Sequence, residues 1–103
     1  MALEALDGPS KSFVLSSVGT VTPVEVKAGG SAFSERKVIT LQGEGKFYIY
    51  FADDGETPNA ATVSSTGMTQ YKSAKESYEA SGSQSVFVLA VTGTVDIRGV
   101  ERA

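Results

Sequence analysis

Three carboxylates surround a glycine in the segment Asp53-Asp54-Gly55-Glu56, and such a group could supply oxygen ligands to a metal ion. Calcium takes about six to eight oxygen ligands, and its loop motif repeats Asp-x-Asp-x-Asp-Gly with a distal Glu. Only a fragment of that motif follows the apolar run Phe47–Phe51. Because Asp and Gly are favoured in turns, we interpret the segment as a solvated turn and expect no metal site.

Two glycines precede a lysine at Gly43-Glu44-Gly45-Lys46, as in part of a phosphate-binding loop. The working motif is Gly-x-x-x-x-Gly-Lys-Ser/Thr between a strand and a helix. Here Phe47 follows the lysine and begins a strand pattern. The sequence therefore favours a hairpin turn, with glycines at positive φ, and predicts no cofactor.

Nucleophilic catalysis by serine or threonine needs a base, most often histidine, and the chain contains no histidine. A Ser–Lys pair stays formally open, with Lys72 or Lys75 near Ser73 and Ser77. Serines are so frequent that this proximity carries little meaning. A paired-carboxylate glycosidase needs a deep cleft, for which a small domain has little volume. We predict no catalytic residue and no enzymatic activity.

Tyr48 and Tyr50 alternate with apolar residues and therefore share one face of a predicted strand. OB-type domains stack bases on aromatic side chains placed in this way, beside a basic groove. Only Arg36, Lys37 and Lys46 lie near in sequence. The pattern favours a half-buried sheet face or a protein contact over a base-stacking platform.

The charge and hydropathy of the chain disfavour polyanions and membranes as partners. Nine Lys and Arg against twelve Asp and Glu leave a net charge of −3. The longest apolar runs, Phe47–Ala52 and Val86–Val91, are far shorter than the roughly 20 residues of a membrane helix. Met1–Pro9 lacks the features of a signal peptide. We expect synthesis in the cytoplasm and no nucleic acid or membrane partner.

The elements that position these residues are predicted to be short β-strands, because apolar and polar residues alternate along them. The predicted strands are Ser12–Val18, Thr20–Lys27, Arg36–Gln42, Lys46–Phe51, Met68–Tyr71, Glu76–Ala80 and two closing strands within Ser85–Val100. Residues 73–80 also have the composition of a short helix, but Ser77 and Tyr78 favour a strand. Asp53–Gly67 is predicted to be the main surface loop.

The closing strands are the clearest pattern in the chain. Val86–Val91 is apolar on both sides, whereas Val95 and Ile97 alternate with Asp96 and Arg98. Thr92-Gly93-Thr94 separates them, which predicts a hairpin between a buried strand and a half-exposed one.

The predicted fold is all-β, a small antiparallel β-sandwich or barrel of about six to eight strands. With 103 residues the chain has room for one domain, at 12–103, after a short N-terminal arm at 1–11. Cysteine and histidine are both absent, so neither disulfides nor a zinc site of those ligands stabilises the fold. Partner subunits are the remaining external source of stability.

Several segments, in this order, resemble a family of small tailed-bacteriophage virion proteins. They are Arg36–Gln42, Phe47–Tyr50, Thr66–Met68 and Val86–Glu101, so that the similarity extends over Phe33–Glu101. The resemblance implies a β-sandwich that decorates or cements a capsid by binding across coat subunits. It also implies the major capsid protein or other virion subunits as partners, location in the virion, and a closed homo-oligomer such as a trimer.

The predicted partner contacts follow from this resemblance and from the arm. Residues 2–9 would lie over a neighbouring subunit, and the two tyrosines or the loop after Asp53 would add area. The candidate partner-binding residues are Leu3, Leu6, Tyr48, Tyr50 and Asp54. Two alternatives stay open: a head–tail connector, neck or tail component, and a phage-encoded module that binds a host protein.

Overall fold

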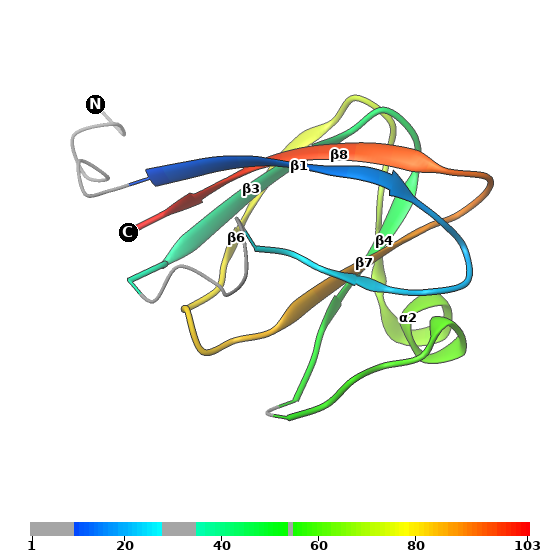
Figure 1. The fold of residues 1–103 in the computed structure, drawn as a ribbon, viewed down its shortest axis with the longest axis horizontal. Coiled ribbons are helices and arrows are strands. Elements are labelled where there is room, and N and C mark those ends of the chain that lie inside the picture. Colours follow the sequence, from blue (N-terminus) through cyan, green and yellow to red (C-terminus); the bar gives the residue numbers. More distant parts are fainter. Residues whose placement is uncertain (1–9, 28–34, 54) are drawn as a thin grey trace.

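The computed structural model describes residues 10–27, 35–53 and 55–103. In this part of the chain two four-stranded antiparallel sheets pack face to face (Figure 1). Sheet I contains β1 (Ser10–Val18), β8 (Val95–Arg102), β3 (Val38–Gly43) and β6 (Lys75–Glu79), in that order. Sheet II contains β2 (Val24–Glu25), β7 (Val86–Ala90), β4 (Phe47–Phe51) and β5 (Met68–Gln70). The predicted all-β sandwich is confirmed.

The core lies between the sheets, because alternate side chains along each strand point toward the opposite sheet. Ile39 and Leu41 of β3 are fully buried there, as are Phe47 of β4 and Ile97 of β8. The remaining buried members of the cluster are Val18, Val26, Ile49, Ala80, Val86, Val88, Ala90 and Val95.

The closing strands do not form the predicted hairpin. β7 pairs with β2 and β4 in sheet II, whereas β8 pairs with β1 and β3 in sheet I. The Thr92–Thr94 connection therefore crosses from one sheet to the other, with Gly93 at a φ of 61°. Both strands are central in their sheets, and this position, not pairing with each other, accounts for their burial.

The Gly43–Lys46 connection is also not the predicted hairpin, because β3 belongs to sheet I and β4 to sheet II. Neither glycine of this connection has a positive φ. A Cβ on Gly43 would lie 2.5 Å from the Phe47 ring, and one on Gly45 would lie 2.9 Å from a Val95 methyl. Close packing around the crossover, and not backbone conformation, requires glycine here.

The predicted surface loop Asp53–Gly67 contains a helix, α2 (Ala60–Thr66). Asn59 caps its N-terminus, where the Asn59 Oδ1 accepts a hydrogen bond from the Thr62 N–H at 2.8 Å. The helix packs on β4 and β7 through its buried Val63. The sequence reading missed this helix because seven residues rich in Ser and Thr have little helical preference without tertiary contacts.

The other strands agree with prediction except near their ends. The predicted strand Thr20–Lys27 shortens to Val24–Glu25, directly after Pro23, which cannot donate to a ladder. Lys75–Glu79 is a strand and not the alternative helix. β1 includes Ser10 and Lys11 from the predicted arm, while residues 1–9 lie outside the described part.

A buried ion pair joins the two sheets at one end of the sandwich. The Arg36 Nη1 lies 2.9 Å from Oε2 of Glu101, and both side chains are essentially inaccessible to solvent. The other Arg36 N–H groups donate to the backbone oxygens of Val26, Ala80, Ser81 and Gln84. All five donors of the guanidinium are therefore used. This arginine links the end of β2, the end of β6, the approach to β7, and β8.

Among the described residues no helix is long and apolar enough to span a membrane.

Candidate protein-binding surface

The outer faces of the two sheets differ in what covers them. On sheet II, α2 packs against β4 and β7, so Phe87 and Leu89 are buried although they point away from the core. Sheet I has no helix over its outer face among the described residues, and Val14 on β1 is 56% exposed there. In the part of the chain that the structure describes, the outer face of sheet I is therefore without a covering helix.

The strand register places two rows of side chains across this open face. One row runs from Val14 through Arg98 and Gln42 to Lys75. The next row contains Ser12, Val100, Thr40 and Ser77. These side chains point outward because the residues between them on β3 and β8, such as Leu41 and Ile97, point into the core.

A groove of about 410 Å³ lies over these rows and is here called the sheet I groove. Its lining residues are Ser12, Phe13, Val14, Thr40, Gln42, Lys75, Arg98, Gly99 and Val100. A second hollow of about 330 Å³ continues from it, since both are lined by Gln42 and Arg98. The second hollow adds Lys72, Ser73 and Glu44.

The charge of this surface is opposite to that of the chain. The groove lining contains Lys75 and Arg98 and no carboxylate. Lys72 and Glu44 line the adjoining hollow, whereas the chain carries a net charge of −3. None of the three cations forms an ion pair with a described residue. The surface combines an apolar floor with unneutralised positive charge, which suits recognition of carboxylates.

The predicted contact residues Tyr48 and Tyr50 lie on the other side of the molecule, on the outer face of sheet II. Both are half-buried. The Tyr50 hydroxyl contacts both carboxylate oxygens of Glu56, at 2.9 and 2.8 Å. Glu56 Oε1 also accepts from the backbone N–H of Asp53 at 2.9 Å, so this tyrosine stabilises the turn before α2.

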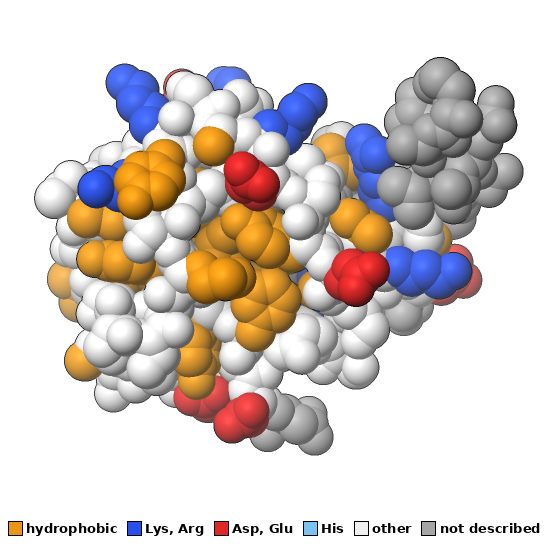
Figure 2. Space-filling view, turned by 180° about the vertical axis from the view of Figure 1, so that it is seen from behind, with side chains coloured by type: hydrophobic (Ala, Val, Ile, Leu, Met, Phe, Trp, Pro, Cys, Tyr) orange, Lys and Arg blue, Asp and Glu red, His pale blue; other side chains and the backbone are white. Residues whose placement is uncertain are grey.

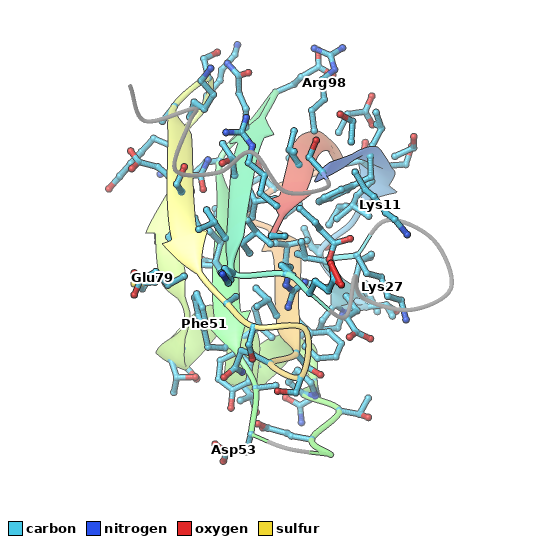
Figure 3. All side chains as sticks on the ribbon, turned by 90° about the vertical axis from the view of Figure 1, so that its left-hand side faces the viewer. Lys11, Lys27, Phe51, Asp53, Glu79 and Arg98 are labelled. Atoms are coloured by element: carbon cyan, nitrogen blue, oxygen red, sulfur yellow. The ribbon has the colours of Figure 1, made fainter. Side chains whose placement is uncertain are left out.

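The other predicted residues, Leu3, Leu6 and Asp54, lie outside the described part of the chain. Of the residues beside Asp54, Gly55 has a φ of 78° and the Glu56 N–H donates to the Asp53 carbonyl oxygen at 2.9 Å. Figure 3 shows Arg98 and Asp53 at opposite ends of the molecule. The groove is therefore separate from the predicted loop contact.

Sequence reasoning missed the groove residues for an identifiable reason. Outward positions on β1 and β8 can be read from their alternation, and Val14 is an apolar residue at such a position. The register that sets Val14 beside Arg98 joins residues from opposite ends of the chain, which alternation alone does not specify.

A second partly exposed apolar region lies along the edges formed by β5 and β6. Met68 and Tyr71 are 52% and 64% exposed, and apolar side chains gather near the middle of the face in Figure 2. The rings of Phe51 and Tyr78 meet edge to face with centroids 6.0 Å apart. Lys46 Nζ lies 5.4 Å from the Tyr71 ring centroid. These contacts already give the aromatic side chains partners within the chain.

Two tyrosines have raised pKa values, and these predict that the stability of the fold depends on pH. The hydrogen bond to Glu56, with its negative charge, raises the pKa of Tyr50 above 10.0. Burial raises the pKa of Tyr78, with a smaller contribution from Glu76. Because the neutral phenols are favoured in the folded state, their stabilisation is present below pH 10 and is lost as pH rises through the raised values.

We therefore expect the tyrosinate absorbance of the native protein to appear at higher pH than that of the urea-unfolded chain. The free energy of unfolding should fall from about pH 10 upward. Tyr50→Phe should reduce this fall, while leaving the contribution of Tyr78. A native titration curve that coincides with the unfolded one would contradict the prediction.

Comparisons with known proteins support the fold and no closer assignment. No protein-family model matches the chain, and no curated protein matches its sequence. The solved structure of the SPBc2 prophage-derived protein YomS is similar over 92% of this chain and 96% of its own, with a TM-score of 0.50 and 16% identity. A chain from disulfide-linked pili of Bacillus endospore appendages is similar over 92% and 87%, with a TM-score of 0.48 and 10% identity. The chain shares the fold of the prophage-derived protein.

Proposed function

We propose that this protein is a non-enzymatic structural component of a bacteriophage virion, which decorates or cements the capsid by binding across coat subunits. The observation that carries the proposal is the open outer face of sheet I, with its groove and exposed Val14. The sequence resemblance to phage virion proteins and the fold shared with a prophage-derived protein support a phage origin.

A structural role agrees with the chemistry of the surface. The groove lining contains no carboxylate and no histidine to activate its hydroxyl groups, Ser12 and Thr40. A stable protein contact buries about 1,600 Å² in total, and a flat sheet face with an apolar centre suits such a contact. We propose the major capsid protein or another virion subunit as the partner, and a closed homo-oligomer such as a trimer on the virion surface.

The direct test is to purify particles from a strain that carries this gene and from one in which the gene is deleted. We expect the protein in purified particles, in a copy number proportional to that of the coat protein. Particles without it should assemble but release their DNA at lower temperature or after milder osmotic shock. A single ring of copies at the neck would instead indicate a connector, and absence from particles would refute the proposal.

A matched pair of variants tests whether the open face makes the contact. Val14 lies in the groove and is 56% exposed, whereas Val21 lies outside it and is 80% exposed. Both tolerate a polar side chain without loss of core packing. Val14→Asp should weaken attachment to particles that lack the protein at least about tenfold, because it places a charge at the apolar centre of the contact. Val21→Asp should leave attachment unchanged; equal effects of the two changes would exclude this face.

A further inference from the structure

We infer that the sheet I groove binds an extended, acidic segment of a partner protein. In this arrangement one aliphatic side chain of the segment covers Val14 and Val100. The carboxylates of the segment's acidic residues pair with Arg98 and Lys75. The inference rests on the proposed function in taking the occupant to be a protein, and it adds the chemistry by which that protein is recognised.

Charge complementarity indicates that the occupant of the groove is negatively charged. Arg98 and Lys75 face the groove without a carboxylate in its lining, whereas in the adjoining hollow Glu44 lies beside Lys72 and Arg98, so the positive charge is concentrated in the groove itself. Asp96, the nearest acidic residue along β8, already accepts a hydrogen bond from the Ser17 N–H at 2.8 Å. A protein with a net charge of −3 that gathers cations on one open face is suited to a partner with carboxylates.

The apolar floor distinguishes a polypeptide from a simple anion. Val14 on β1 and Val100 on β8 are diagonal neighbours, because Ser12 pairs with Val100 and Val14 with Arg98. Contacts of this kind commonly centre on one well-packed apolar anchor surrounded by polar groups. An aliphatic side chain over the two valines provides that anchor, whereas a phosphate chain leaves the floor uncovered.

The spacing across the sheet sets the pattern of the segment. Val14, Arg98, Gln42 and Lys75 belong to four adjacent strands, so the row spans about 14 Å at ~4.8 Å per strand. An extended segment places side chains on one face every ~6.6 Å. An aliphatic residue over Val14 therefore puts the next two same-facing residues near Arg98 and near Lys75. The expected pattern is aliphatic-x-acid-x-acid.

The centre of the row favours an extended segment over a helix. Thr40 and Gln42 place a hydroxyl and an amide group there. The Thr40 hydroxyl bonds with that of Ser77 at 2.9 Å and the Gln42 Nε2 donates to the Ser73 carbonyl at 3.1 Å, which leaves the Gln42 Oε1 and the second Nε2 hydrogen for a ligand. An extended segment has free backbone N–H and C=O groups to bond with them, whereas a helix satisfies its own backbone groups.

The test is a selection from a library of displayed random nine-residue peptides on the immobilised full-length protein. We expect enrichment of peptides with an aliphatic residue followed by acidic residues at the second and fourth positions after it. The double variant Lys75→Glu/Arg98→Glu should bind these peptides at least about tenfold more weakly. Both side chains are exposed, and an unchanged circular dichroism spectrum and melting temperature would show that this variant folds.

A matched control reverses two exposed cations outside the groove, in the variant Lys37→Glu/Lys46→Glu, which changes the net charge by the same amount. This control should retain the peptides. The inference is overturned if no peptide is enriched, if the enriched peptides are not acidic, or if both double variants bind equally. Displacement of the peptides by a DNA oligonucleotide at equal concentration would overturn it in favour of nucleic acid.

These outcomes separate the two proposals. If acidic peptides are selected but the protein is absent from purified particles, the inference stands and the virion role is refuted. Presence in particles together with full attachment of Lys75→Glu/Arg98→Glu would retain the virion role and refute the inference.

Discussion

Arg36→Met is expected to lower the free energy of unfolding by about 4 kcal/mol or more, which is much of the stability of a small domain. The substitution leaves the Glu101 carboxylate in the interior without the guanidinium 2.9 Å away. It also removes the side-chain donors to four backbone carbonyl groups, those of Val26, Ala80, Ser81 and Gln84. Of these, the Ser81 oxygen keeps a hydrogen bond from the Gln84 N–H at 3.0 Å. Removing the guanidinium from a buried carboxylate and removing donors from buried carbonyl groups both cost free energy, so the two effects act in the same direction.

Denaturant unfolding followed by circular dichroism measures this effect. Glu101→Gln should cost less, because it removes the countercharge but leaves the four carbonyl groups bonded. Arg98→Met removes an exposed arginine and should stay within about 0.5 kcal/mol of the parent protein.

A double variant, Arg36→Met/Glu101→Leu, distinguishes the two contributions to the loss. Replacement of a buried ion pair by apolar residues is often neutral. Here the carbonyl groups of Val26, Ala80 and Gln84 would still lose the donor that Arg36 provides, so the double variant should remain clearly less stable than the parent protein. The free energy of unfolding of Arg36→Met could instead lie within about 1 kcal/mol of that of the parent protein, as for a surface substitution. In that case this ion pair does not stabilise the end of the sandwich.

Gly67→Ala is expected to lower the free energy of unfolding by about 2–3 kcal/mol, although it adds only one methyl group. A Cβ at this position would lie 2.5 Å from the Val63 carbonyl oxygen and 2.8 Å from that of Ile49. Both are backbone atoms, so relief requires α2 to move away from β4. The φ of Gly67 is −74°, which suits any residue, so the cost arises from contact alone.

Gly19→Ala is the matched control, because nothing lies within 4 Å of a Cβ there. It should change stability by at most about 0.5 kcal/mol. Thermal unfolding compares the two variants, and amide exchange in α2 should accelerate in Gly67→Ala alone. Equal stabilities of the two variants would show that α2 can shift on the sheet without cost.

The positions of the strands along the chain were more predictable than the strands with which they pair. Alternation identified β3, β4 and β8 within two residues of their ends, because burial of one face imposes a period of two on the sequence. The two predicted hairpins, β3–β4 and β7–β8, were wrong because short connections also carry a chain from one sheet to the other in a sandwich. A short turn signal does not distinguish these outcomes.

The candidate site was less predictable than the fold. The sequence predicted that Tyr48 and Tyr50 lie on a half-buried sheet face or at a protein contact. Both are half-buried on the outer face of sheet II, where α2 packs against β4, and the Tyr50 hydroxyl contacts Glu56. The helix that changes their exposure was itself missed, since Asn59 and the contacts of Val63 stabilise it. Without this helix and the turn before it, the sequence could not indicate that the Tyr50 hydroxyl has a partner within the chain.

The amino-acid sequence by itself determined the all-β class, the apolar positions of the core, the acidic net charge and the lack of histidine and cysteine. Each of these is a property of single residues or of neighbours along the chain. Only the tertiary structure decided which sheet each strand joins, which outer face stays open, and that Arg36 meets Glu101 across 65 positions of sequence. These depend on pairing between distant segments, whose choice is made by the packing of the whole core and not by local preference.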